Sequence, residues 1–480
     1  MAWRPVGLVA VAVTALLLAT AGRYDYHRDE LYFRLLGRDP RWGYVDEPPF
    51  TPLLTRLAIE VFGDHVWAIR VPSALMIGAL AVLAAAIARE VGGGAVAQAL
   101  AASGVAGAFP LVAGHLVTTA TPDLLVWAGV LLFVLRALLR EAGRNWIGAG
   151  VLAGLGLYNK HLVVLLLGCL AAGLLLAGPR RVLAGRQLWL AVAVAAVIGL
   201  PNLLYQIAND FPQAAMAQAI AENKGAESRA QLLPFQLILL GLFLVPVWVA
   251  GLVTLLRDPR LRAARAVAVA YPVMLVLVLV IAGQPYYPMG LVLTLFAVGA
   301  VPVERWLAGR RGRRWLLGAA VAANVAVSVV FALPVLPADR AGPIAAVNST
   351  VADQIGWPEY ARQVSDVYAA LPPADRARAV IVTGNYGEAG ALDRHGLPDV
   401  YSGHNELHRY GPPPDSRTVL VLVSQAPPER IAATFGACRP QTRLRNDAGV
   451  ENEELAATVY VCRDLPRPWR ELWPELRHFD

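Results

Sequence analysis

Apolar stretches of about 17 to 25 residues recur along the chain between Val6 and Leu333, separated by short polar segments. A helix rises about 1.5 Å per residue, so a stretch of this length crosses the hydrocarbon core of a bilayer. Together with the distribution of arginines described below, the pattern predicts eleven membrane-spanning helices, at about residues 5–22, 70–88, 95–112, 123–139, 146–158, 162–178, 188–207, 232–256, 266–283, 288–304 and 315–334. After Pro337 these stretches stop and charged residues become frequent. We therefore predict an all-α polytopic membrane domain over residues 1–337 and a soluble domain over residues 338–480.

The C-terminal unit has a different pattern, made of short apolar runs rich in β-branched residues. Such runs predict buried strands at residues 379–383, 418–423 and 458–462. A turn and a helix fit between Gly384 and Arg394, which gives a small α/β domain. Residues 384–387 are rich in glycine but lack a dinucleotide fingerprint, so we interpret them as a structural turn. A contribution of this domain to acceptor binding is the alternative.

Arginine assigns the loops to the two sides of the membrane, because basic residues concentrate in short cytoplasmic loops. Four clusters lie in alternate loops, at residues 136–144, 180–186, 257–265 and 305–314, whereas the loops at 115–122 and 284–287 carry no Lys or Arg. Two short spans on either side of residues 159–161 keep all four clusters on one side. An odd number of spans from a cytoplasmic N-terminus then places the C-terminal domain outside, with a first outer loop over residues 23–70.

Composition agrees with this division and excludes one class of partner. Hydrophobic residues make up 57% of the chain and charged residues 16%, against about 25% in soluble domains. The net charge of +7 comes from arginines in short loops, so it does not indicate nucleic-acid binding. Cys438 and Cys462 both lie in the C-terminal unit and can form a disulfide there, since that unit is predicted to be extracytoplasmic; free thiols are the equal alternative.

The first predicted span has a second interpretation. Residues 19–21, Ala-Thr-Ala, resemble a signal-peptidase site, and cleavage would remove this span without changing the later topology. We favour retention, because Arg4 is not part of a long basic region and the loop that follows carries candidate chemistry.

That first outer loop holds a pair of carboxylates, Asp29 and Glu30, soon after the first span. Carboxylates beside aromatic residues at a membrane surface can act as bases or bind a divalent cation. The alternative is an ordinary solvated loop with interfacial aromatic residues.

Lysine is rare in this chain, which contains only Lys160 and Lys224 among 42 Lys and Arg residues. Lys160 lies between two apolar spans, where an ionisable group is costly and indicates function. A cation there can bind a phosphate at the membrane boundary. A lysine that extends from a helix end toward water is the alternative.

Other outer positions carry weaker signals. Tyr286 and Tyr287 can line a lipid or sugar site, or belong to an interfacial aromatic belt. His115 and Asp123 are expected at the outer ends of the third and fourth spans, and Asp123 is expected to cap a helix. Residues 208–230 are expected to form a long loop that can close over a substrate.

Several of these motifs together resemble a known family, the GT-C superfamily of glycosyltransferases. The resemblance is strongest to glycosyltransferase family 39, which includes protein-mannosyltransferase-like and aminoarabinose-transferase-like members. The motifs that carry it are Arg28–Phe33, Trp42–Pro49, Thr121–Asp123, Tyr158–His161, Pro285–Pro288, Asn385–Leu392 and Ser402–Asn405.

The resemblance implies a GT-C membrane domain that transfers a sugar, with inversion, from a polyprenyl-phosphate donor on the outer face of the cytoplasmic membrane. It implies that Asp29 is the base and that Glu30 positions the acceptor or a metal ion. The remaining implied site residues are Lys160, His161 and Arg28 for the donor phosphate, with Asp46, Glu47, His115, Asp123, Tyr286 and Tyr287 for the substrate. Metal use stays open, since the family resemblance supports metal-linked and metal-free members. The acceptor also stays open among a protein, a glycan, a lipid and a secreted metabolite.

Two other classes compete with a glycosyltransferase. A secondary transporter or lipid flippase also has many spans and an intramembrane cation. Such proteins usually contain inverted repeats and broken helices near the midplane, whereas this sequence shows no clear repeat. A non-catalytic scaffold leaves the carboxylates of the first outer loop unexplained.

Overall fold

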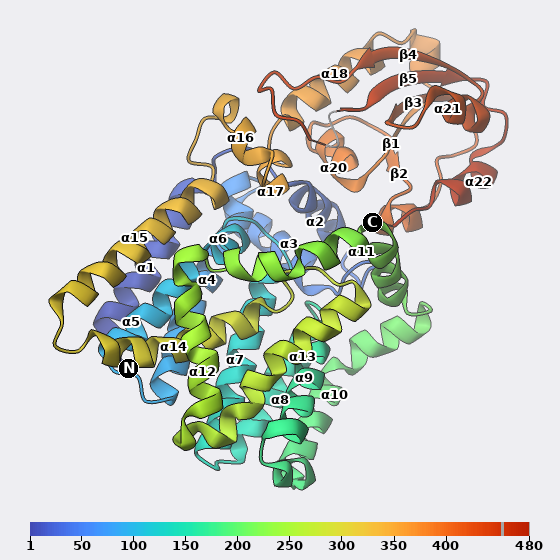
Figure 1. Ribbon diagram of the computed structural model, residues 1–480. Coiled ribbons are helices and arrows are strands. Elements are labelled where there is room, and N and C mark those ends of the chain that lie inside the picture. Colours follow the sequence, from blue (N-terminus) through green and yellow to red (C-terminus); the bar gives the residue numbers. More distant parts are fainter. Residues whose placement is uncertain (453–455, 480) are drawn as a thin grey trace.

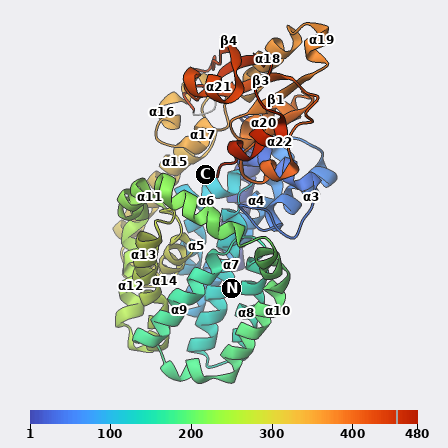
Figure 2. The ribbon, with the colours of Figure 1, turned by 90° about the vertical axis from the view of Figure 1, so that its right-hand side faces the viewer.

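The computed structural model of the protein describes residues 1–452 and 456–479. Helices from the first part of the chain form a long bundle, and the C-terminal part forms a smaller domain of helices and strands at one end of it (Figure 1). A view turned by 90° shows the same division, with the first outer loop beside the C-terminal domain (Figure 2). The predicted fold class is confirmed: a polytopic helical domain is followed by a small α/β domain.

Each predicted span falls on a helix or a bent pair of helices. In chain order these are α1 (Trp3–Thr20), α4 (Val66–Glu90), α5 with α6 (Ala95–Ser103 and Ala108–His115), α7 (Ala120–Leu139), α8 (Arg144–Gly156), α9 (Leu162–Ala177), α10 (Arg186–Ala208), α11 with α12 (Pro212–Ile238 and Val245–Arg257), α13 (Arg265–Ile281), α14 (Met289–Leu307) and α15 (Arg311–Ala332). Within the described residues, seven helices are long and apolar enough to cross a membrane, or up to nine if each bent pair is one span. The two remaining predicted spans fall on α8 and α9, which have only 13 and 16 residues.

Two predicted spans are not single straight helices. The stretch over 95–112 bends by 60° between α5 and α6, where a Cβ at Gly107 would lie 2.7 Å from the carbonyl oxygen of Leu240. The stretch over 232–256 bends by 69° between α11 and α12, at Gly241, whose φ is +96°. Glycine permits the close approach in the first case and the left-handed backbone in the second. A hydropathy pattern does not report either bend.

The prediction of a loop over residues 208–230 was wrong. Most of it belongs to α11 (Pro212–Ile238), which lies across the end of the bundle that faces the C-terminal domain (Figures 1 and 2). Pro212 stands at the first helical position, and the segment is rich in Ala, Gln and Glu, which are good helix formers. The polar side chains of residues 208–230 are unsuited to the bilayer core, but they do not prevent the segment from forming a helix.

The centre of the bundle is α14, which is buried without interruption from Met289 to Val301. It packs against α12 through two glycines: a Cβ at Gly251 or at Gly299 would lie 1.8 Å from a backbone oxygen of the other helix. Small residues at helix contacts let membrane helices approach closely. In contrast, only 22%, 17% and 17% of the residues in the apolar windows of α1, α10 and α15 are buried, as expected of helices that face lipid.

The C-terminal domain contains one five-stranded sheet in the order β2-β1-β3-β5-β4. The first three of these strands are parallel, whereas β5 pairs antiparallel with β3 and β4. The strands are β1 (Ala379–Thr383), β2 (Val400–Ser402), β3 (Val419–Ser424), β4 (Ala437–Arg443) and β5 (Thr458–Arg463). Its helices are α16 (Gly342–Ala345), α17 (Ser349–Ala352), α18 (Trp357–Ala369), α19 (Pro373–Arg376), α20 (Tyr386–Arg394), α21 (Pro428–Phe435) and α22 (Trp469–Leu472).

The three predicted strands are confirmed as β1, β3 and β5, and α20 is confirmed as the helix after β1. Sequence reasoning missed β2, which has three residues, and β4, whose residues are mostly exposed and polar. Neither strand has the apolar run that marks a buried strand. The structure joins β4 to β5 by a disulfide between Cys438 and Cys462.

The first outer loop and the C-terminal domain share one hydrophobic core. The loop forms α2 (Arg28–Arg38) and α3 (Phe50–Phe62), and the buried side chains of α2 join those of α18, α20 and the sheet in a single cluster. α20 packs on α2 at two glycines, where a Cβ at Gly387 or Gly390 would lie 2.7 or 2.8 Å from the Cβ of Arg28 or Leu31. This contact holds α2 directly against α20, although more than 340 residues separate Arg28 from Tyr386.

Candidate functional site

A cavity of about 1000 Å³ opens between the end of the helix bundle and the C-terminal domain. Its polar wall comes from the first outer loop, from the turn between α8 and α9, and from residues 386 and 405 of the C-terminal domain. Apolar side chains of α9, α10 and α11 line much of the rest, among them Leu165, Leu203 and Ile220. The only two lysines of the chain, Lys160 and Lys224, both line this cavity.

Asp29 lies in the first turn of α2, which begins with an N-terminal capping box. His27 is the N-cap, and its Nδ1 accepts a hydrogen bond from the Asp29 backbone N–H at 3.2 Å. The Asp29 side chain is 35% exposed, and its Oδ1 accepts a 2.8 Å hydrogen bond from the Tyr386 hydroxyl. Burial by itself raises the pKa of Asp29, but the positive charge of Arg28 and the Tyr386 hydrogen bond lower it below its usual value. Asp29 is therefore ionised at neutral pH and faces the cavity.

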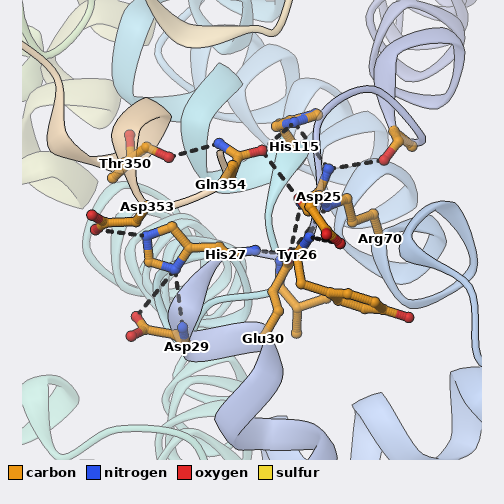
Figure 3. Close-up of polar contacts among 12 residues, drawn as sticks. Asp25, Tyr26, His27, Asp29, Glu30, Arg70, His115, Thr350, Asp353 and Gln354 are labelled. Atoms are coloured by element: carbon orange, nitrogen blue, oxygen red, sulfur yellow. Dashed lines mark hydrogen bonds and ion pairs between the residues drawn. The ribbon is translucent and has the colours of Figure 1, made fainter. Parts of the chain in front are cut away.

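Glu30 does not reach the cavity. Its carboxylate is fully buried and forms an ion pair with Arg70, which is also fully buried, at 2.7 Å (Figure 3). It also accepts hydrogen bonds from the backbone N–H groups of His27 and Val117, both at 2.8 Å. Arg70 in turn donates to the carbonyl oxygen of Ala21 at 2.9 Å. Glu30 thus holds the first outer loop to α4 and to the end of α1, and its oxygens are not free to bind a metal ion or an acceptor.

His115 belongs to the same buried network and also lies outside the cavity lining. Its Nε2 lies 3.2 Å from Arg70 Nη1 and 3.2 Å from the Gln354 amide oxygen (Figure 3). Asp123 is buried as well, in the first turn of α7, and Thr119 occupies the N-cap position of that helix. The predicted capping role of Asp123 is therefore wrong. Its Oδ1 has no hydrogen-bond partner within residues 1–452 and 456–479.

Asp46 and Glu47 line the cavity next to Asp29. Asp46 accepts hydrogen bonds from the Tyr32 hydroxyl and from the Asn405 amide N–H, both at 3.0 Å. Burial raises the pKa of Asp46 to about 7 despite these hydrogen bonds. Burial, followed by the charges of Asp46 and Asp29, also raises the pKa of Glu47. The adjacent carboxyls of Asp46 and Glu47 therefore favour holding a proton near neutral pH.

Lys160 lies in the turn between α8 and α9 and points toward two aromatic rings. Its Nζ donates to the Tyr286 hydroxyl at 3.1 Å and lies 5.3 Å from the Tyr286 ring centroid and 5.5 Å from that of Tyr287. In the described part of the chain, no carboxylate is within ion-pair distance of Lys160. An ammonium group held by neutral aromatic rings keeps its charge available for an anionic ligand.

Two hydrogen bonds join the first outer loop to the residues just before Lys160, one from Thr51 to Asn159 and one from Phe50 to Tyr158. Asn159 accepts a 2.9 Å hydrogen bond from the Thr51 hydroxyl, at the start of α3, and donates at 2.7 Å to the Thr119 carbonyl oxygen. The Phe50 N–H donates to the carbonyl oxygen of Tyr158 at 2.9 Å. These contacts place residues 46–48 beside the α8–α9 turn. His161, next in sequence, lines the cavity with its Nε2 2.7 Å from Asn202 Oδ1.

Of the predicted site residues, the cavity collects Arg28, Asp29, Asp46, Glu47, Lys160, His161, Tyr286 and Tyr287, whereas Glu30, His115 and Asp123 lie outside its lining. Sequence reasoning did not assign Tyr386, Asn405 and Tyr32 to the site. The sequence around Tyr386 predicts a structural turn, and the motifs around Tyr386 and Asn405 otherwise carry only the family resemblance, because their contacts with the first outer loop exist only in the folded chain. Within the described residues, no group of three His, Cys, Asp or Glu side chains is arranged to hold a metal ion.

Comparisons with known proteins fit this architecture. Residues 46–205 match the family model described as dolichyl-phosphate-mannose-protein mannosyltransferase. No curated protein matches the chain in sequence. Among solved structures, ArnT from Cupriavidus metallidurans bound to undecaprenyl phosphate has a TM-score of 0.62 at 20% identity, covering 95% of this chain and 97% of that one.

Two other solved structures share the fold over most of this chain. The oligosaccharyltransferase of Archaeoglobus fulgidus, tethered to an acceptor peptide, matches with a TM-score of 0.51 at 15% identity. The match covers 82% of this chain and 64% of the oligosaccharyltransferase chain. The arabinofuranosyltransferase AftD from Mycobacteria matches with a TM-score of 0.52 at 15% identity. The match covers 98% of this chain and 40% of the AftD chain. The chain is thus a multi-pass membrane protein that shares its fold with these three solved structures, and its residues 46–205 match a mannosyltransferase family model.

Proposed function

We propose that this protein transfers a sugar from a polyprenyl-phosphate donor to an acceptor hydroxyl on the outer face of the membrane, with inversion at the anomeric carbon. The observation that carries the proposal is that one cavity contains both an ionised carboxylate, Asp29, and a lysine, Lys160, with no carboxylate within ion-pair distance among the described residues. The apolar part of the same cavity suits a polyprenyl chain.

In this scheme Asp29 takes the proton of the acceptor hydroxyl as its oxygen attacks the anomeric carbon. The bond between that carbon and the phosphate oxygen breaks, and its electron pair leaves with the polyprenyl phosphate. Negative charge increases on the phosphate, and the ammonium of Lys160 stabilises it more in the transition state than in the ground state. A phosphate leaves without protonation, so one base suffices, unlike the two carboxyl groups of a glycoside hydrolase.

The other cavity residues take supporting roles in this proposal. Arg28 and His161 lie where they can contact the donor phosphate, and Tyr286 and Tyr287 orient Lys160. Tyr386 orients Asp29. We assign Glu30 and His115 to the support of the loop rather than to the reaction, because Arg70 engages both of them.

The test is sugar transfer by the purified protein in nanodiscs, from undecaprenyl-phosphate sugars to a cell-envelope fraction as acceptor. Asp29→Asn keeps the shape of the side chain and removes the base, so we expect transfer to fall by at least about 100-fold. Asp39→Asn is the matched control, because Asp39 follows α2 in the same loop and is half exposed to solvent.

Both variants should elute as folded protein with unchanged melting temperatures. Transfer by Asp29→Asn at the wild-type rate would overturn the assignment of the base. Substrate movement that requires sealed vesicles, without any sugar transfer in nanodiscs, would instead indicate a transporter or flippase.

The proposal also requires the C-terminal domain to lie outside the cytoplasm. The disulfide between Cys438 and Cys462 supports this placement, since disulfides persist in oxidising compartments. Alkaline phosphatase fused after residue 480 should be active in cells, whereas green fluorescent protein at the same point should not fluoresce. The opposite result would place the domain, and the cavity beside it, on the cytoplasmic side.

A further inference from the structure

Two buried hydrogen-bond acceptors next to the cavity have no partner among the described residues. They are Oδ1 of Asn405, whose side chain belongs to the C-terminal domain, and Oε1 of Glu47 in the first outer loop. Asn405 is 3% exposed and Glu47 is 8% exposed, and both residues line the cavity. A buried acceptor that has lost water and gained no donor is costly, so such atoms in a functional cavity point to a ligand that donates to them.

The orientation of Asn405 is set by its neighbours. Its Nδ2 donates to Asp46 Oδ2 at 3.0 Å, which leaves Oδ1 as the group without a partner. Its backbone is left-handed, with φ at +48°, and its N–H donates to the His478 carbonyl oxygen at 3.1 Å. The next residue, Glu406, accepts from the Val45 N–H at 2.8 Å and from Arg41 at 3.0 Å. Hydrogen bonds therefore hold the C-terminal domain against the first outer loop at the place where Asn405 lines the cavity.

We propose that Asn405 and Glu47 form a subsite for the hydroxyl groups of the transferred sugar, so that the C-terminal domain helps to select the donor. This inference rests on the proposed polyprenyl-phosphate chemistry. The sugar ring must lie between the base and the group that holds the phosphate, and Glu47 lies within electrostatic reach of both Asp29 and Lys160. Sugar hydroxyls are O–H donors, which is the chemistry that an amide oxygen and a carboxyl oxygen accept.

The experiment compares binding with and without the sugar, using the full-length protein in nanodiscs. The ligands are undecaprenyl phosphate and three undecaprenyl-phosphate sugars, which carry mannose, glucose or arabinose. The ratio of the Kd for undecaprenyl phosphate to the Kd for the best sugar-bearing ligand measures what the sugar contributes. No acceptor is present, so the acceptor does not affect this ratio.

Asn405→Gly removes the side chain and keeps a residue that tolerates a positive φ. We expect it to lower the ratio by about 5- to 10-fold, the size of one lost hydrogen bond, with the Kd for undecaprenyl phosphate unchanged. Glu47→Met, which removes both carboxyl oxygens and keeps a side chain of similar volume, is the second variant and should also lower the ratio. Gln441→Ala is the control, because Gln441 is an exposed residue of β4.

The outcomes separate the two levels of the proposal. If wild-type protein does not bind undecaprenyl phosphate, the proposed donor class fails. If it binds undecaprenyl phosphate but both variants keep the wild-type ratio, only the sugar subsite fails. Equal weakening of both ligands by Asn405→Gly would show a structural role and would also overturn the subsite.

Discussion

Replacing Tyr386 by Phe removes one hydroxyl group from the site and leaves the aromatic ring in place. The ring lies between those of Tyr32 and His404, at centroid distances of 4.4 and 4.5 Å, and His404 stacks in turn on His478 at 4.6 Å. These contacts do not involve the hydroxyl, so we expect Phe to pack as Tyr does. What the substitution removes is the 2.8 Å hydrogen bond to Asp29 Oδ1.

The size of the effect follows from that hydrogen bond. A hydrogen bond to a charged group is worth about 1.5–3 kcal/mol, and one pKa unit corresponds to about 1.4 kcal/mol. The Asp29 side chain is 35% exposed, so water replaces part of the lost interaction, and we expect a change of about one unit. The hydroxyl stabilises the charged form of Asp29 and thus lowers its pKa. The substitution therefore raises the pKa of Asp29.

The assay is the pH dependence of kcat/KM for sugar transfer, whose acidic limb reports ionisation of the base in the free enzyme. In Tyr386→Phe this limb should move about one unit toward higher pH, with a smaller change above neutrality. Tyr401→Phe is the control, because Tyr401 lies on β2 and does not line the cavity. An unchanged acidic limb, or an equal loss at every pH, would refute the proposed link between Tyr386 and the ionisation of Asp29.

Three further predictions follow from the same contacts. Lys160→Met should lower kcat/KM by about 100-fold or more and weaken binding of undecaprenyl phosphate, whereas Lys160→Arg should restore part of both; equal kinetics in all three proteins would remove Lys160 from the site. Arg70→Met leaves Glu30 buried without its partner, which costs about 3–5 kcal/mol, so the melting temperature and the yield should both fall; an unchanged melting temperature would argue against the buried pair. Asp46→Asn should raise the melting temperature at pH 8 and leave it nearly unchanged at pH 4. The reason is that the raised pKa of Asp46, about 7, makes folded wild-type protein lose stability as the pH rises from about 4 to 7; the same melting difference at both pH values would contradict this.

The membrane architecture was predictable because the bilayer imposes a strong and local rule. A segment either has enough consecutive apolar residues to cross or it does not, and each predicted span does fall on helical structure. The bends at Gly107 and Gly241 were not predictable, since they depend on what approaches the backbone: Leu240 in the first case and Asn324 in the second. The helix α11 was missed because its polarity was interpreted as a loop.

In the candidate site, too, some features were predictable from the sequence and others were not. The sequence by itself determined the unusual residues, namely a carboxylate pair after the first span and a lysine in a chain whose other cations are almost all arginine. Only the tertiary structure decided which member of the pair faces the cavity. Asp29 and Glu30 are adjacent on α2, and a helix turns about 100° between neighbouring residues, so one points to the cavity and the other to Arg70. Likewise, no local pattern connects Tyr386 and Asn405 to carboxylates more than 350 residues away, because that contact arises from packing between distant segments.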